Sequence, residues 1–475
     1  MKTLICIPCL LTGGTEIQTL NTVQALVQGG HEVTVACYYE HTPDMVARYR
    51  RAGAEVLLFS PEGIRVGGYK CILFLYRHLR RAIRMVRPDV IHVQYMAPGA
   101  TVILLLWLMG VKNIIATAHT AADIYRDLRL IHFLQRRCLR AFTCITERAE
   151  RSFFGSSQLY TADMLLGRRN HFTIYNALPK ATVLQTTDNG QRTTDSHPEE
   201  NTKLSTLNAE QDNSHTDYTD YTDSCKSLRP CTSGVLTEGS QLTAHGSQPT
   251  DSQLSTLNAK QELSHTDLAD YTDSCKSLRP CCHPDGDTKH YTLNSKHNTI
   301  GVVSRLEPIK GMDLVVPAFA EVLKMYPETQ LLVVGDGTLR PSMEEQAAQL
   351  ACADHIRFVG RQLQEELSQW YSQMDIVLMP SRSEGFGLTA IEAMAHGGVM
   401  VASDVGGLPE VVRDGICGLL HRTEDIADMA AKVCTLIGDP ALYTRLRAQS
   451  LVEVEKYSFE RYAALMNDLY NKLGR

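Results

Sequence analysis

The sequence lacks a hydrophobic run long enough to cross a membrane. Its longest apolar stretch, Thr101 to Met109, falls well short of the roughly 20 residues that a transmembrane helix needs. A secretory signal is also missing, because the apolar run that follows Lys2 ends at Pro8 and leads at once into a glycine turn. We interpret that run as a β-strand and expect a cytoplasmic protein.

Metal-binding and disulfide patterns are scarce, although the chain has 14 cysteines. Most of them are scattered through apolar runs, which is typical of reduced cytosolic thiols packed as small hydrophobic residues. Cys6 and Cys9 have the spacing of a redox pair, but they lie where a strand meets a turn, so we favour a structural role. No metal site is predicted.

Basic residues are in excess only in the first part of the chain. Residues 1–180 carry 22 Lys and Arg against 12 Asp and Glu, an excess of ten positive charges, in a chain of net charge −6. Two groups recur at helical spacing: Arg77, Arg80, Arg81, Arg84 and Arg87, then Arg136, Arg137 and Arg140. A solvated helix face explains the Arg77–Arg87 group as well as an anionic membrane surface or acceptor does. Nucleic acid is not predicted, since no binding motif accompanies the charge.

One long segment does not resemble folded protein. Residues 180–297 are rich in Ser, Thr, Asp, Asn and Gln, and Lys203 to Cys231 recurs with few differences as Gln253 to Cys281. Its Cys and His residues (Cys225, Cys231, Cys275, Cys281, Cys282 and His283) match no zinc spacing. We expect a duplicated, disordered insertion between an N-terminal domain, residues 1–179, and a C-terminal domain, residues 298–475, whose last helix is a candidate to pack back on the first domain.

Each domain alternates short β-branched runs with longer amphipathic stretches, the pattern of a parallel sheet covered by helices on both faces. The expected strands of the first domain are Thr3–Ile7, Glu32–Ala36, Val90–Gln94, Asn113–Ala118 and Phe142–Thr146. Those of the second are Thr299–Ser304, Gln330–Gly335, Ile356–Val359, Ile376–Met379 and Val399–Ser403. We therefore predict an α/β protein with two Rossmann-like, doubly wound domains that face each other across a cleft. Ligands of such sheets bind beyond the carboxyl ends of the strands.

Two loops of the first domain are candidates for that binding region. Gly13 and Gly14 follow the first strand and enter a helix, where backbone amides can approach a phosphate, although a simple tight turn explains them nearly as well. His119 follows the fourth expected strand and is expected to face the cleft rather than the core.

The second domain carries more specific signals. Arg305 and Lys310 lie on one loop after its first strand, where two cations suit a diphosphate leaving group. Glu384 stands in a glycine-bearing loop after a later strand. The amides from Phe386 through Thr389, including those of Gly387 and Leu388, open a helix and can hold phosphate or sugar oxygens. Glu392, expected on that helix's first turn, can accept hydrogen bonds from ribose hydroxyls, or serve only as a favourable helix-start charge.

These segments resemble the retaining glycosyltransferase family 4, of GT-B architecture: SRLEPIKG at 304–311, VVGDGTLR at 333–340, SEGFGLTAIEAMAHG at 383–397 and ASDVGGLPEVV at 402–412. The resemblance implies that Arg305 and Lys310 bind the donor diphosphate, Glu384 the transferred sugar and Glu392 the ribose. It also implies main-chain contacts from Phe386, Gly387 and Leu388, base contacts from Gly360 and Arg361, and completion of the site by Gly14 and His119.

The implied reaction moves a sugar, with retention at the anomeric carbon, from a UDP- or GDP-sugar to a glycan, lipid-linked or other hydroxyl acceptor. Arg305, Lys310 and helix-end amides stabilise the leaving diphosphate without an obligatory metal, since no DxD-like pair follows a strand, and no cofactor is expected. Glu384 acts either as nucleophile or as a positioning group. Surface polysaccharide or glycolipid synthesis at the inner membrane face fits the basic domain. The alternatives are an epimerase or phosphorylase of the same architecture, or a non-catalytic sugar-nucleotide-binding protein.

Overall fold

The computed structural model describes residues 1–94, 96–122, 128–164, 170–180 and 299–474. Except for Lys180, the predicted insertion, with its repeat and its Cys and His residues, lies outside these described residues. Within them, no helix combines the length and apolar character that a membrane span requires.

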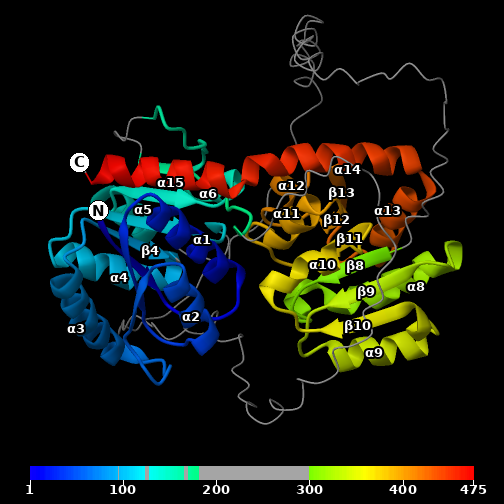
Figure 1. Ribbon diagram of the computed structural model, residues 1–475, viewed down its shortest axis with the longest axis horizontal. Coiled ribbons are helices and arrows are strands. Elements are labelled where there is room, and N and C mark those ends of the chain that lie inside the picture. The colour runs from blue at the N-terminus through cyan, green and yellow to red at the C-terminus, as the bar shows by residue number, and fades with distance from the viewer. Residues whose placement is uncertain (95, 123–127, 165–169, 181–298, 475) are drawn as a thin grey trace, which may run out of the picture. The chain divides into compact units, whose positions relative to one another are not determined.

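Seven parallel strands form the first sheet, in the order β3-β2-β1-β4-β5-β6-β7 (Figure 1). The strands are β1 Lys2–Ile7, β2 Glu32–Cys37, β3 Glu55–Leu58, β4 Val90–Gln94, β5 Ile114–Ala118, β6 Ala141–Cys144 and β7 His171–Thr173. The helices between them are α1 Gly14–Gln28, α2 Pro43–Arg51, α3 Gly68–Val86, α4 Met96–Leu108, α5 Arg129–Arg137 and α6 Glu147–Phe154. The strand order reverses between β1 and β4, so the loops that follow these two strands diverge and leave room for a ligand.

Six parallel strands form the second sheet, in the order β10-β9-β8-β11-β12-β13. The strands are β8 Thr299–Val303, β9 Gln330–Val334, β10 Ile356–Gly360, β11 Ile376–Met379, β12 Val399–Ser403 and β13 Gly418–His421. Its helices are α8 Val315–Met325, α9 Arg340–Gln349, α10 Leu367–Tyr371, α11 Leu388–Ala395, α12 Leu408–Val411, α13 Ile426–Gly438, α14 Pro440–Val454 and α15 Phe459–Leu473. Here the order reverses between β8 and β11.

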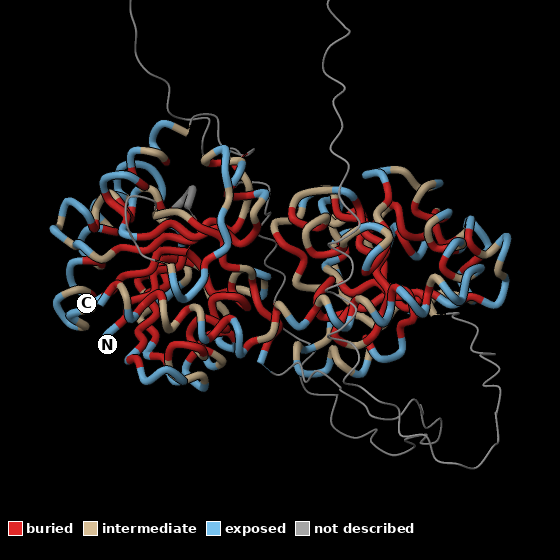
Figure 2. The backbone as a smooth tube through the Cα atoms, turned by 90° about the horizontal axis from the view of Figure 1, so that it is seen from above, coloured by how far each residue is buried: buried red, intermediate tan, exposed pale blue. Residues whose placement is uncertain are grey.

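Each sheet is buried on both faces, as Figure 2 shows by the red interior of both sheets. In β1, Ile5 and Ile7 belong to one apolar layer, and Leu4 and Cys6 to the layer on the opposite face. Successive residues of a strand point to opposite faces, so a strand that is covered on both sides must be apolar throughout. This is why the strands read as continuous apolar runs in the sequence.

Helix α15 at the end of the described chain packs on α1 of the first sheet. Its apolar residues, including Met466 and Leu469, belong to the same buried layer as Ile5 and Ile7. The hydroxyl of Tyr462 lies 2.7 Å from Thr22 Oγ1 of α1. Residues that come last in the chain therefore complete the core of the first sheet.

Most of the predicted strands are confirmed to within a residue or two, but three strands were missed and one boundary was wrong. The missed strands β3, β7 and β13 are short, and each lies at an edge of its sheet, where some of its residues are only half-buried or exposed and the apolar pattern is weaker. The strand predicted for Phe142–Thr146 ends at Cys144, because Thr146 is already the N-cap of α6. Its hydroxyl accepts a hydrogen bond from Ala149 N at 3.1 Å.

The cysteines in the described part of the chain are free thiols. Cys6 and Cys9 are both buried, and the Sγ of Cys9 donates to Glu16 Oε1 at 3.2 Å. Burial raises the pKa of the Cys6 thiol to about 12, so this thiol stays protonated at neutral pH. The structural interpretation of this pair agrees with that environment.

Candidate active site

The loops after β8 and β11 are brought together because these strands are neighbours where the second sheet reverses its order. Gly311 ends the β8 loop with a φ of +67°, and a Cβ built on it would lie 2.0 Å from the carbonyl oxygen of Pro380 in the β11 loop. Only glycine accommodates both the left-handed backbone and that close approach. The glycine that ends the SRLEPIKG segment therefore joins the two loops.

Lys310 and Glu384 meet across this junction. Lys310 Nζ donates to Glu384 Oε2 at 2.7 Å, and the two side chains are 23% and 14% exposed. The sequence assigned Lys310 to the donor diphosphate and Glu384 to the transferred sugar. Their ion pair shows that the two side chains are in direct contact. Arg305, on the same loop as Lys310, is exposed.

Glycines of the ASDVGGLPEVV segment hold the backbone of the Glu384 loop. Gly406 has a φ of +58°, and a Cβ there would lie 1.8 Å from the carbonyl oxygen of Glu384. Gly407 N donates to the same oxygen at 3.0 Å. This pair therefore fixes where Glu384 stands, a function that the sequence pattern alone did not assign.

Helix α11 begins beside this loop. Gly387 precedes it in a left-handed conformation (φ +100°), Phe386 is buried, and Leu388 and Thr389 on the first turn are half-buried. The first amides of a helix have no partner within it and carry partial positive charge. The α11 N-terminus, at the end of the Glu384 loop, thus has the polarity that phosphate or sugar oxygens require.

Glu392 is the fifth residue of α11, so the prediction that it lies on the first turn is wrong. The helix begins only at Leu388, because the glycine-bearing loop continues through Gly387. The Glu392 carboxylate is buried and accepts from Tyr371 Oη at 2.8 Å and Gln364 Nε2 at 2.7 Å. Burial raises its pKa to about 7. Neither partner was predicted, because both precede Glu392 by 20 or more residues.

Arg382, also unpredicted, ties the same loop to its surroundings. Its guanidinium donates to both carboxylate oxygens of Asp313, at 2.7 and 2.8 Å, and to Glu424 at 2.7 Å. These hydrogen bonds to carboxylates raise the pKa of Arg382 and lower that of Asp313. Its role is to anchor the loop that carries Glu384.

Gly13 is the N-cap of α1, in extended conformation. A Cβ on Gly13 would lie 2.5 Å from Glu16 Oε2, and one on Gly14 would lie 3.6 Å from the side chain of Leu388. The Glu16 carboxylate beside this turn is better suited to accept from hydroxyls than to hold a phosphate. The structure therefore brings the glycine turn near the start of α11 but gives it an acidic neighbour.

Gly360 and Arg361 lie at the end of β10. Gly360 has a φ of +83°, and its carbonyl oxygen accepts from Gly335 N at 2.9 Å, which joins the ends of β9 and β10. Arg361 is exposed and its guanidinium lies 3.4 Å from Thr12 Oγ1, next to the glycine turn. These two residues lie on the opposite flank of the sheet from β11, which carries Glu384.

His119, just beyond β5, is 93% buried, since its exposed fraction is 7%. The ring was expected to face the cleft; its Nε2 bonds Gln94 Oε1 at 2.7 Å, at the end of the neighbouring β4. Burial lowers the pKa of His119 to about 3, so the ring is neutral at physiological pH. Its carbonyl oxygen lies close to Gly385, where a Cβ would come within 2.4 Å of it. The described residues contain no group of three or more His, Cys, Asp or Glu placed to hold a metal ion.

Two family models match the chain, one in each half. Residues 12–161 match the glycosyltransferase family 4 model, and residues 286–451 match the model of glycosyl transferases group 1. The chain belongs to the family 4 glycosyltransferases. The resemblance of its segments to that family is confirmed, and so is the two-domain α/β architecture of the GT-B type.

Solved structures share this fold. The crystal structure of Anabaena Alr3699/HepE in complex with UDP has a TM-score of 0.63 at 14% identity, with 99% of this chain and 100% of that one covered. Sucrose-phosphate synthase from Thermosynechococcus elongatus has a TM-score of 0.60 at 17% identity, with 100% and 99% covered. At such low identity the likeness shows the fold alone.

Curated relatives are similar over a shorter range. D-inositol 3-phosphate glycosyltransferases from Streptomyces bingchenggensis and Rhodococcus erythropolis are 36% and 38% identical over 180 residues. Each match covers 36% of this chain and 40% of the relative. The chain thus spans about two fifths of the length of these curated relatives.

Proposed function

We propose that this glycosyltransferase moves a sugar from a UDP- or GDP-sugar to a hydroxyl acceptor, with retention at the anomeric carbon and without an obligatory metal. The observation that carries the proposal is the Lys310–Glu384 pair, which adjoins the N-terminus of α11 where β8 and β11 lie side by side. A cation, a carboxylate and a helix N-terminus in one place are the groups that a sugar diphosphate requires.

In the proposed complex, the diphosphate lies between Arg305, Lys310 and the first amides of α11. Binding gives Lys310 a second anionic partner, and this frees part of the Glu384 carboxylate to accept from hydroxyls of the transferred sugar. As the bond to the leaving diphosphate breaks, negative charge grows on its oxygens, and fixed cations and amides stabilise that charge. Anabaena Alr3699/HepE has been solved with UDP and with UDP-glucose, which supports a donor of this class.

The nucleoside is proposed to lie along the β9–β10 side of the sheet. Gly360 and Arg361 would contact the base. The Glu392 carboxylate accepts one hydrogen bond each from Tyr371 and Gln364, and its remaining lone pairs would accept from the ribose hydroxyls. Gly13, Gly14 and His119 would complete the site from the first sheet. The domain division at 179 and 298 belongs to this proposal, with the insertion joining the two halves.

The acceptor is proposed to be a glycan or lipid-linked hydroxyl, in surface polysaccharide or glycolipid synthesis by a cytoplasmic enzyme attached to the inner membrane face. Helix α3 supports this. Its first two turns expose apolar side chains, including Tyr69 and Leu73, and its later turns expose Arg77, Arg80 and Arg84. Arg87, predicted on the same face, instead ends the helix in a left-handed conformation.

The arginines border a surface hollow of about 460 Å³, which is lined by Tyr76, Arg77, Arg80, Arg81, Arg84 and Met85. Apolar and basic side chains together suit a surface of anionic lipid. At about 1 kcal/mol per arginine, Arg80→Ala with Arg84→Ala would weaken binding to phosphatidylglycerol vesicles about 30-fold. Arg50→Ala with Arg51→Ala, an equal charge change at exposed positions on α2, is the control. If the two double variants sediment equally with the vesicles, the α3 arginines form only a solvated helix face.

The proposed reaction is tested on the purified full chain with UDP- and GDP-sugars, with and without hydroxyl acceptors. We expect nucleotide release that requires acceptor, and a product with the donor's anomeric configuration by NMR. Full activity after exhaustive chelation is expected. Epimerised donor would indicate an epimerase, glycan cleavage by phosphate a phosphorylase, and binding without turnover a non-catalytic protein. An inverted product would overturn the retaining mechanism.

A further inference from the structure

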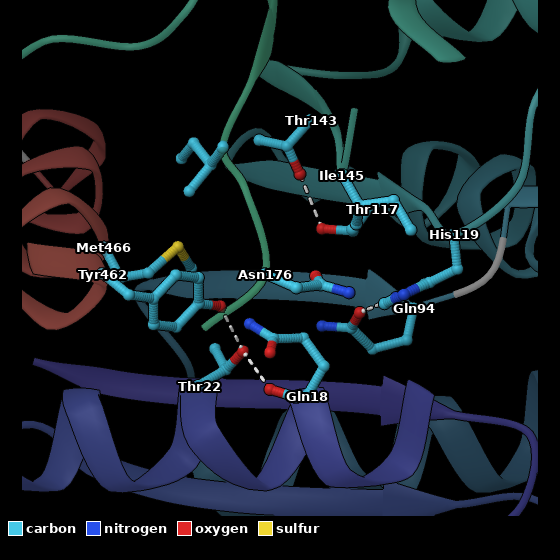
Figure 3. A pocket seen from close by; sticks show the side chains of 11 residues that line it. Gln18, Thr22, Gln94, Thr117, His119, Thr143, Ile145, Asn176, Tyr462 and Met466 are labelled. Carbon is cyan, nitrogen blue, oxygen red and sulfur yellow. Dashed lines mark hydrogen bonds between the residues drawn. The ribbon is translucent and has the colours of Figure 1, made fainter. Parts of the chain in front are cut away.

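A small polar cavity lies below His119, inside the first half of the molecule (Figure 3). Its volume is about 20 Å³, and it is lined from the ends of β4, β5 and β6, from α1 and from α15. Most of its lining side chains are amides, hydroxyls or imidazole, which is unusual beneath a sheet that is otherwise packed with apolar residues. Most buried polar groups have a hydrogen-bond partner in the protein or in an ordered water.

The donors and acceptors around the cavity have a consistent direction. Thr143 Oγ1 donates to Ala116 O over a long 3.4 Å contact, and in that arrangement it accepts from Thr117 Oγ1 at 2.6 Å. Thr117 then accepts from His92 Nε2, also at 2.6 Å, which places the His92 proton on Nε2. A hydroxyl carries a single proton, so each bond fixes the next.

Helix α15 supplies the other end of this chain. With its proton on Nε2, His92 accepts at Nδ1, and the partner there is the Tyr470 hydroxyl at 2.6 Å. Burial raises the pKa of Tyr470 far above its usual value, so its hydroxyl remains a donor. The last described helix therefore fixes the tautomer of a histidine in the middle of the sheet.

Gln94 lies between this chain and His119. Its Nε2 lies 3.4 Å from His92 Nε2, which carries a proton in that chain and so does not accept, and its Oε1 lies 2.7 Å from His119 Nε2. An amide oxygen only accepts, so His119 Nε2 must carry the proton of the neutral ring. His119 Nδ1 is then left as the basic nitrogen.

We propose that Gln94 is a positioning residue, which holds His119 in the Nε2–H tautomer and in the ring orientation that their 2.7 Å hydrogen bond sets. The functional part of the proposal rests on the function proposed above, in which His119 completes the donor site from the first sheet.

The test that needs no activity is ¹⁵N-detected NMR of the histidine rings in the full chain, with His119→Ala used to assign the signals. We expect wild-type His119 as the Nε2–H tautomer, and a mixture of tautomers in Gln94→Met, which has similar volume and lacks the amide. Gln94→Glu keeps an acceptor for Nε2 and should keep that nitrogen protonated. If wild-type His119 carries its proton on Nδ1, or if Gln94→Met leaves the tautomer unchanged, the proposal is wrong.

Turnover adds a readout that a structural role would not give. In the wild-type background, Gln94→Met should lower kcat about tenfold, with little change in the KM of the donor, on the scale of one lost orienting hydrogen bond. In the His119→Ala background the same change should alter kcat less than about twofold. Equal losses in both backgrounds would make Gln94 merely structural. Absence of transfer by the wild-type chain would refute the proposed function while the NMR result still decides the tautomer.

Discussion

Replacement of Lys310 by alanine tests the proposed donor site most directly. A unit cation about 4 Å from a phosphate charge contributes about 4 kcal/mol at an effective dielectric constant near 20. The Glu384 carboxylate, 2.7 Å from Lys310 Nζ, offsets part of that attraction. We therefore expect Lys310→Ala to lower donor turnover about 10²-fold, or about 2.7 kcal/mol, the scale of a lost transition-state charge partner.

The same pair contributes little to folding, at most about 1 kcal/mol, because both side chains retain contact with solvent. Thermal unfolding of Lys310→Ala should therefore stay near that of the parent. Lys324→Ala is the matched control, because Lys324 pairs with Glu321 at the same distance of 2.7 Å but lies exposed on α8. That variant should keep full turnover.

The charge swap Lys310→Glu with Glu384→Lys separates binding from structure. It restores an ion pair, so it should recover thermal stability, yet it moves the cation onto the other loop and should remain inactive. Turnover is measured as acceptor-dependent nucleotide release. Unchanged turnover in Lys310→Ala, or restored turnover in the swap, would refute the assignment of Lys310 to the diphosphate.

Three further outcomes are expected. Glu392 has a folded pKa of about 7, so between about pH 4.5 and 7 the folded chain keeps a proton that the unfolded chain has lost, and stability should fall as pH rises through that range. Glu392→Gln should flatten this part of a series of thermal melts, and an unaltered slope would contradict the assigned pKa. Gly311→Ala should destabilise by roughly 1–3 kcal/mol in urea unfolding and cost clearly more than Gly30→Ala, which has a similar φ of +78° but open space around its Cβ; equal losses would mean that the close approach to Pro380 is relieved without cost. Among the described residues, Gln18 Nε2 is buried with no hydrogen-bond partner, and Gln18 lines the cavity of about 20 Å³, which has room for one water. A high-resolution crystal structure should therefore show an ordered water there, and an empty cavity would contradict this.

The sequence by itself determined the fold class and the segments that carry the chemistry. Strands buried on both faces are mainly apolar, so β1, β8 and β11 are visible as short apolar, β-branched runs whose loops follow at once. Glycines with positive φ, such as Gly311 and Gly387, are equally local, because the backbone conformation of one residue requires them. These features depend on neighbours along the chain, which the sequence contains directly.

Only the tertiary structure decided which of these groups meet. Lys310 and Glu384 are 74 residues apart and pair because the order of the second sheet makes β8 and β11 neighbours. Glu392 is buried by Tyr371, and His119 turns to Gln94 from the adjacent strand. Burial, protonation and partner choice depend on strand order and on packing across the sheet. No spacing along the chain specifies these, so the sequence could name the residues but not their contacts.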